Sequence, residues 1–123
     1  MKALLLIFAG GGLGSVVRFL LGRWVSGLHH INFPFGTLTV NIVACFVLGV
    51  VVGLSDHRQL LSPDSRIFWA VGFCGGFSTF STFSYETLEL FQNSMTMSGV
   101  MYVVASVSLC LLAVWGGVYA GRV

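Results

Sequence analysis

Four long stretches of this 123-residue chain contain no aspartate, glutamate, lysine or arginine: residues 3–17, 24–55, 67–85 and 90–121. A helix needs about 20 apolar residues to cross the hydrocarbon core of a bilayer. A soluble domain carries about 25% charged residues, whereas this chain has 8% charged and 56% hydrophobic residues. So short a chain cannot bury that much apolar surface in its own core. The sequence therefore predicts an all-α integral membrane protein.

We expect one transmembrane domain over residues 1–123, with four helices near residues 3–24, 34–54, 66–91 and 98–121. The only strongly polar loop ends in Ser62-Pro63-Asp64. This triplet is typical of a helix start, with an N-cap serine, a first-turn proline and an acid that complements the helix dipole. The N-terminus resembles a signal peptide but has no convincing cleavage site, so we assign it to the first helix.

The third predicted helix contains an unusual run from Gly72 to Glu86, in which Gly75-Gly76 is followed by hydroxyl and phenylalanine residues. Glycine destabilises a helix by about 1 kcal/mol relative to alanine, and hydroxyl side chains compete for backbone hydrogen bonds. We therefore expect this helix to be broken mid-membrane, which is tolerated only against protein or a water-lined cavity. The broken ends would present carbonyls to cations and amides to anions.

The second half of this helix is expected to have a hydroxyl face and an aromatic face. At 100° per residue the hydroxyl face comprises Ser78, Ser81, Thr82 and Tyr85, and the opposite face comprises Phe77, Phe80 and Phe83. The positive edge of an aromatic ring attracts an anion without a fixed charge. Ordinary packing of the phenylalanines remains an equal alternative from the spacing alone.

Other polar residues lie inside the predicted spans. Asn41 supplies two amide donors suited to an anion, or else an interhelical hydrogen bond. Arg18 either extends to the membrane interface or raises the local potential for anions. Glu86 is either an interfacial carboxylate or a proton-coupling acid. A polar track on the fourth helix would comprise Tyr102, Ser106 and Ser108.

Mostly small residues recur every fourth position on the first two helices. On the first helix they are Gly10, Gly14, Gly22 and Ser26, with Arg18 in the same row, and on the second they are Thr37, Asn41, Cys45, Gly49 and Gly53. Such stripes allow close approach of helices in lipid. Four helices cannot surround a wide lumen, so a pore requires at least a dimer.

No pattern indicates an enzyme, because no nucleophile has a base beside it and no acid–base pair or phosphate-binding loop occurs. The net charge of +2 does not indicate nucleic-acid binding. Cys45, Cys74 and Cys110 lie far apart in apolar stretches, without metal-like spacing, and are interpreted as packing residues.

Three motifs resemble the small bacterial fluoride channels of the Fluc (CrcB) family. They are Gly10-Gly11 through Gly14 to Arg18-Phe19, then Pro34-Phe35-Gly36-Thr37-Leu38 to Asn41, and above all the run from Gly75 to Phe83. The last motif is specific, and the resemblance covers essentially the whole chain.

The resemblance implies an antiparallel, dual-topology homodimer with two fluoride pores and a central structural Na⁺. Gly75 and Ser78 match the residues whose backbone carbonyls hold this ion. The residues matched to the fluoride pore are Asn41, Phe80, Phe83, Ser81, Thr82, Tyr102 and Ser108. Arg18 matches the arginine near the vestibule.

The resemblance also implies passive, fluoride-selective export across the bacterial inner membrane, which relieves fluoride toxicity. Two other functions stay open: a proton-coupled exporter of the small multidrug type, which needs an embedded carboxylate such as Glu86, and a non-transporting membrane scaffold.

Overall fold

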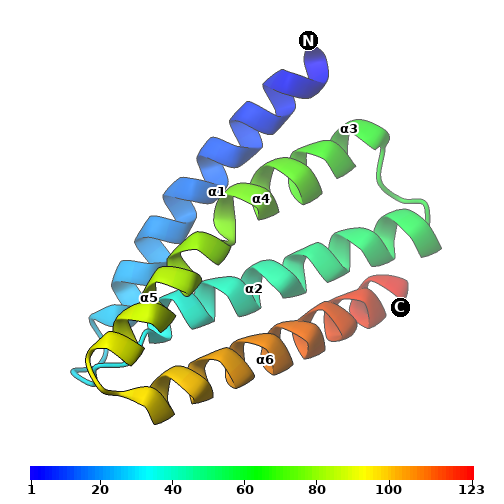
Figure 1. The fold of residues 1–123 in the computed structure, drawn as a ribbon. Helices are drawn as coiled ribbons and strands as arrows, with labels where there is room; N and C mark the ends of the chain where they lie inside the picture. Colours follow the sequence, from blue (N-terminus) through cyan, green and yellow to red (C-terminus); the bar gives the residue numbers. More distant parts are fainter.

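The computed structural model describes residues 1–123. All of its regular secondary structure is helical, with no strand. This confirms the all-α prediction. The helical elements in chain order are α1 (Lys2–Ser26), α2 (Phe35–Val52), η1 (Gly53–His57), α3 (Pro63–Arg66), η2 (Ile67–Phe73), α4 (Cys74–Phe77), α5 (Phe80–Gln92) and α6 (Thr96–Arg122) (Figure 1). η1 and η2 are π-helical, so their hydrogen bonds are one residue longer than those of an α-helix.

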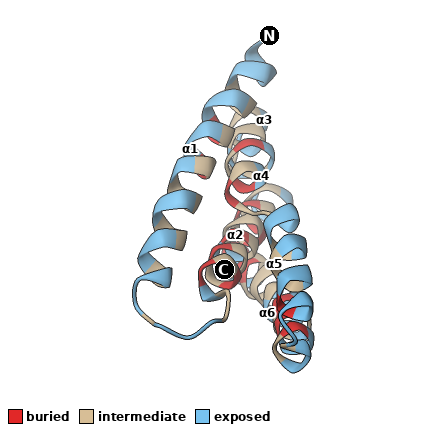
Figure 2. Cartoon of the chain, turned by 60° about the vertical axis from the view of Figure 1, so that its left-hand side comes forward, coloured by how far each residue is buried: buried red, intermediate tan, exposed pale blue.

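Three helices are long and apolar enough to cross a bilayer: Lys2–Ser26, Phe35–His57 and Thr96–Arg122. Only 18 of the 123 residues are buried, and large apolar side chains such as Phe8 and Leu111 are exposed. Figure 2 shows that the buried residues lie where helices face each other, while the outer side of α1 is exposed. This distribution suits lipid as the surrounding solvent, and the chain is a membrane protein.

The segment between the loop after η1 and the loop before α6 is not one straight helix. Ser62 caps α3 by accepting a hydrogen bond from the Ser65 amide, and Pro63 occupies the first turn, which confirms the predicted helix start. The chain then runs through η2 and α4 to Phe77. Ser78 and Thr79 are extended, with ψ of 157° and 116°, and α5 begins at Phe80. The interruption follows the two glycines of α4.

The helices are held together by close backbone contacts at glycines. α2 and α6 have the most extensive contact of any two elements. A Cβ atom on Gly49 would lie against the backbone of Val114, and one on Gly117 against the backbone of Phe46. In lipid, close packing of this kind drives helix association. α2 and α6 therefore form a rigid pair.

α1 packs in the same way against the first half of the interrupted segment, because Gly10 and Gly14 lie against the backbone of Phe68 and Phe73. α5 instead diverges from this half and approaches α6 (Figure 1). The break thus lies where the chain passes from the α1 side of the molecule to the α6 side.

Candidate functional site

Asn41 on α2 holds the extended backbone at the break. Its Nδ2 donates to the Thr79 carbonyl at 3.2 Å, and the Thr79 amide donates to Asn41 Oδ1 at 2.9 Å. The two bonds together fix the orientation of the side-chain amide, because only this orientation satisfies both. The interhelical hydrogen bond considered for Asn41 is therefore present. One N–H of the amide remains for another acceptor.

The break leaves the four backbone carbonyls of residues 75–78 without their helical partners. In a continuous helix the Thr79 amide would bond to the Gly75 carbonyl, but it donates to Asn41 instead. The Thr82 amide would bond to the Ser78 carbonyl, but it donates to Thr79 Oγ1 at 3.2 Å. The two carbonyls that the family resemblance assigns to Na⁺, those of Gly75 and Ser78, are among the four that the break frees, whereas the Gly76 carbonyl accepts a hydrogen bond from Ser15 Oγ at 3.4 Å.

Thr79 caps α5 and gathers the first hydroxyls of that helix. Its Oγ1 lies 3.2 Å from Ser81 Oγ and 3.1 Å from Thr82 Oγ1. The Ser81 and Thr82 side chains are exposed in the single chain. Three hydroxyl groups and the amides of the first turn of α5 thus lie together at the positive end of a 13-residue helix.

A cavity of about 250 Å³, termed the inner cavity, lies beside the break. It is lined by Asn41, Cys45, Ser78, Thr79, Phe80, Phe83, Ser106, Val107 and Cys110. None of these side chains carries a charge. The Ser106 hydroxyl is buried and has no hydrogen-bond partner within the chain. An unpaired buried hydroxyl costs about 1–3 kcal/mol, so this group is a donor available to a ligand in the cavity.

Aromatic rings form one wall of the inner cavity. The Phe80 and Phe83 centroids are 5.5 Å apart with the ring planes tilted by 44°, and Phe83 lies 5.1 Å from Tyr102. Phe80 is 78% exposed in the single chain. The sequence grouped Phe77 with these rings, but Phe77 belongs to α4 and is buried against Val40 and Ala44. The expected common face fails at this residue because the helix is interrupted after it.

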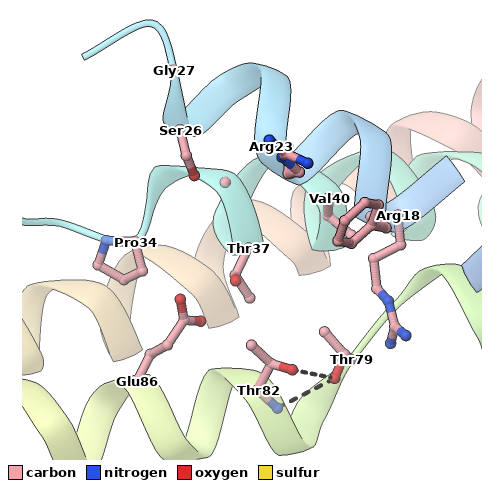
Figure 3. Close-up of a pocket in the computed structure, with 13 residues that line it drawn as sticks. Arg18, Arg23, Ser26, Gly27, Pro34, Thr37, Val40, Thr79, Thr82 and Glu86 are labelled. Carbon is pink, nitrogen blue, oxygen red and sulfur yellow. Dashed lines mark hydrogen bonds between the residues drawn. The ribbon is translucent and has the colours of Figure 1, made fainter. Parts of the chain in front are cut away.

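A larger cavity of about 570 Å³, termed the vestibule cavity, lies on the other side of Thr79 (Figure 3). Its polar lining comes from α1, α2 and α5 and comprises Arg18, Arg23, Ser26, Thr37, Thr79, Thr82 and Glu86. Figure 3 shows Arg18 near Thr79 at one end and Glu86 at the other, with Thr37 between them. Gly22 and Gly36 also line it. A Cβ atom on Gly36 would lie 2.9 Å from the Gly22 carbonyl oxygen, so the missing side chain lets α2 approach α1 closely.

Tyr102 and Glu86 connect α6 to the vestibule cavity. The Tyr102 hydroxyl donates to Glu86 Oε1 at 3.2 Å, and Tyr102 is completely buried. Glu86 is half-buried and also lines a third cavity at the helix ends, together with Glu89 and Asn93. Tyr102 therefore contacts Phe83 with its ring and Glu86 with its hydroxyl, and it lines neither cavity.

No group of three or more His, Cys, Asp or Glu side chains is placed to hold a metal ion. A hard cation such as Na⁺ takes oxygen ligands, and the freed carbonyl oxygens of Gly75 and Ser78 are chemically of this kind. A Cβ atom on Gly75 would meet no other atom within 4 Å. The backbone at the break is thus open enough for an ion or a second chain.

The assembled site can be compared with known protein families. The model of the family described as CrcB-like protein, Camphor Resistance (CrcB), matches residues 5–118. The chain belongs to the CrcB family.

Individual relatives of this CrcB family member are similar over almost their whole length. A protein of Rhizobium meliloti (strain 1021) named "Fluoride-specific ion channel FluC" is 44% identical over 95% of this chain and 94% of the relative. A protein of the same name from Geobacter sulfurreducens is 41% identical over 99% of this chain and 98% of the relative. "Fluoride-specific ion channel FluC 1" of Methanosarcina acetivorans is 44% identical over 95% of this chain and 88% of the relative. These relatives are named as channels, in agreement with the expectation that the chain is not an enzyme.

Of the predicted site residues of this CrcB family member, Arg18, Asn41, Ser78, Phe80, Thr82 and Phe83 line one of the two cavities, whereas Gly75, Ser81, Tyr102 and Ser108 line neither. Ser108 is exposed and lines neither cavity, whereas Ser106 lines the inner cavity. Cys45, Cys110 and Thr37 also line the cavities but were not predicted. The signal for Cys110 is its spacing, because it follows Ser106 by four residues and so lies on the same helix face.

Proposed function

We propose that the protein is a passive, fluoride-selective channel of the bacterial inner membrane. The observation that supports this most strongly is the uncharged inner cavity beside the break, where free donors and ring edges meet. Relatives named as fluoride-specific channels support fluoride as the ion. Fluoride would leave the cytoplasm down its own gradient, which relieves its toxicity.

The proposed path begins in the vestibule cavity. Arg18 and Arg23 raise the local potential there, which increases the concentration of anions at the entrance. The hydroxyls of Thr79 and Thr82 line the end of this cavity near the break. Thr79 also lines the inner cavity, so an ion that passes Thr79 moves from one cavity to the other.

In the inner cavity the ion would exchange water for protein donors. The free N–H of Asn41 and the unpaired Ser106 hydroxyl are such donors. The edges of Phe80 and Phe83 add weak positive potential. Conduction requires binding that is strong enough for entry and weak enough for exit. Neutral donors meet both conditions, because a fixed cation in this cavity would hold the ion.

The pore is proposed to be completed by a second, antiparallel copy of the chain. Phe80 is 78% exposed and the Gly75 backbone faces open space. A four-helix chain also cannot enclose a lumen alone. In this arrangement the segment Pro63–Gln92 forms the third of four spans, interrupted mid-membrane. Each subunit would then contribute to two separate pores, which lie off the symmetry axis.

A structural Na⁺ is proposed at the centre of this dimer. The Gly75 and Ser78 carbonyls from both subunits would hold it. The fit rests on the side chains of Asn41 and Thr79, which accept the amide hydrogen bonds that these carbonyls would receive in a continuous helix. When bound, the ion supplies positive charge that offsets part of the cost of anions in a low dielectric.

Fluoride efflux from liposomes tests the proposal. The Asn41→Asp protein replaces a donor with a carboxylate, and the Phe80→Ile protein removes a ring edge, so both should lose most of the efflux. Ser84→Ala is the control, because Ser84 is exposed on α5 and lines neither cavity, and it should keep the wild-type rate. Wild-type rates in both Asn41→Asp and Phe80→Ile would reject these roles.

A proton-coupled exporter is the second candidate, and it requires an embedded carboxylate. Glu86 is half-buried and accepts a hydrogen bond from Tyr102. However, Glu86 does not line the inner cavity. Efflux of fluoride without a proton gradient separates a channel from this exporter, and absence of any efflux would indicate a scaffold.

A further inference from the structure

Two cysteines line the inner cavity on adjacent helices. Cys45 comes from α2 and Cys110 from α6. Both are free and half-buried, whereas the third cysteine, Cys74, is buried and does not line the cavity. Gly49 on α2 lies against Val114 on α6, and Cys45 and Cys110 each precede one of these residues by four positions, so the two cysteines occupy matching positions on the paired helices.

The helix register places these thiols one turn beyond the polar groups of the cavity. Cys45 follows Asn41 by four residues, and Cys110 follows Ser106 by four residues. Residues four apart lie one above the other on a helix face. The two thiols are therefore the next polar groups along the wall of the inner cavity.

The backbone that carries the two thiols is rigid. One turn further along, Gly49 on α2 lies against Val114 on α6, with the Gly117 Cα 3.0 Å from an ideal Cβ. This contact leaves no room for the helices to approach or slide. Two thiols held in this way act as one chelating unit, because the second binds at a high effective concentration.

Thiol pairs bind soft metal ions in preference to hard ones. When a soft divalent ion such as Hg²⁺ binds, each thiol releases one proton and each sulfur forms one bond to the metal. The +2 charge of the ion then balances two thiolates, and the product is neutral. Charge neutrality suits a low-dielectric site, where an unpaired ion is very costly.

We propose that Cys45 and Cys110 form a two-coordinate binding site for soft, thiophilic divalent metal ions, and that an ion bound there blocks the inner cavity. The blocking part of this inference rests on the proposed channel function. The binding part depends only on the position of the two thiols.

The binding test uses purified, reduced full-length protein and mercuric chloride as the probe, followed by washing with a monothiol. Washing strips mercury from single cysteines by thiol exchange but not from a chelating pair. Wild type and Cys74→Ala should retain one mercury per subunit, measured by mass. Cys45→Ala and Cys110→Ala should each retain none. Equal retention by wild type and either of these variants would overturn the site, as would a disulfide found in place of the metal.

The conduction test uses the same proteins in liposomes. Mercuric ion should reduce fluoride efflux at least tenfold in wild type and Cys74→Ala, and a dithiol should restore it. Cys45→Ala and Cys110→Ala should resist the block, which is measured in each variant as the ratio of its own efflux with and without mercury. Unchanged efflux in mercury-loaded wild type would overturn the block. If wild type conducts no fluoride even without mercury, the proposed function fails, and the mass measurement still decides the site.

Discussion

The two cavities on either side of Thr79 share helices but differ in charge. The vestibule cavity carries Arg18, Arg23 and Glu86, while the inner cavity has no charged side chain. At 4 Å two unit charges interact by about 1 kcal/mol in bulk water and about 4 kcal/mol at an effective dielectric of 20. Charge at the wide entrance therefore attracts anions without trapping them, whereas the same charge beside the break would dominate the energy of the ion.

The largest expected effect comes from moving a charge into the inner cavity. Ser106→Asp places a carboxylate beside the path, and about 4 kcal/mol of repulsion corresponds to about a thousandfold loss of fluoride efflux. Ser26→Asp adds the same charge to the vestibule cavity and should reduce efflux about fivefold. Ser106→Ala, which only removes the donor, separates loss of the hydroxyl from repulsion. Equal losses in the two aspartate variants would contradict the distinction between the cavities.

A smaller effect, on the stability of the protein, is expected for a substitution of Thr79 at the boundary between the cavities. Thr79→Val removes the Oγ1 that accepts from the Thr82 amide. Loss of an N-cap costs about 1 kcal/mol, so the free energy of unfolding in detergent should fall by about that amount. Ser84→Ala, at an exposed position on the same helix, is the control and should leave stability unchanged. If both variants are equally stable, Thr79 does not cap α5.

The smallest effect is expected for Arg18→Gln in the vestibule cavity. Removing one cation from a hydrated entrance should slow efflux a few-fold at low salt. Since salt screens such charges over about 10 Å at 0.1 M, the difference from wild type should shrink as ionic strength rises. Arg122→Gln, which alters an exposed arginine at the end of α6, should show no such dependence. A salt-independent loss in Arg18→Gln would instead indicate direct binding of the ion.

The sequence predicted the all-helical fold because composition and spacing act locally. Charge-free stretches identified apolar helices, and the glycine–hydroxyl run marked the region where the structure interrupts the helix at Ser78 and Thr79. The small-residue stripes had two functions that spacing could not separate. Gly49 and Gly53 pack against α6, while Asn41 and Cys45 on the same stripe line the inner cavity.

What the sequence could not supply was the relative rotation of the helices. Ser106 and Ser108 are the same residue type on the same helix. Only the packing of α6 against α2 places Ser106 at the cavity and leaves Ser108 exposed. The partner of Asn41 was also unpredictable, because it is a backbone group exposed only by the break.

The most direct measurement of the central claim compares fluoride and chloride efflux from the same liposomes, in the absence of a proton gradient. Fluoride should be lost rapidly, whereas chloride should be lost only at the rate of protein-free vesicles, because small neutral donors and ring edges replace the hydration shell of the smaller ion. Equal efflux of the two anions, or fluoride efflux that appears only when a proton gradient is imposed, would contradict the central claim.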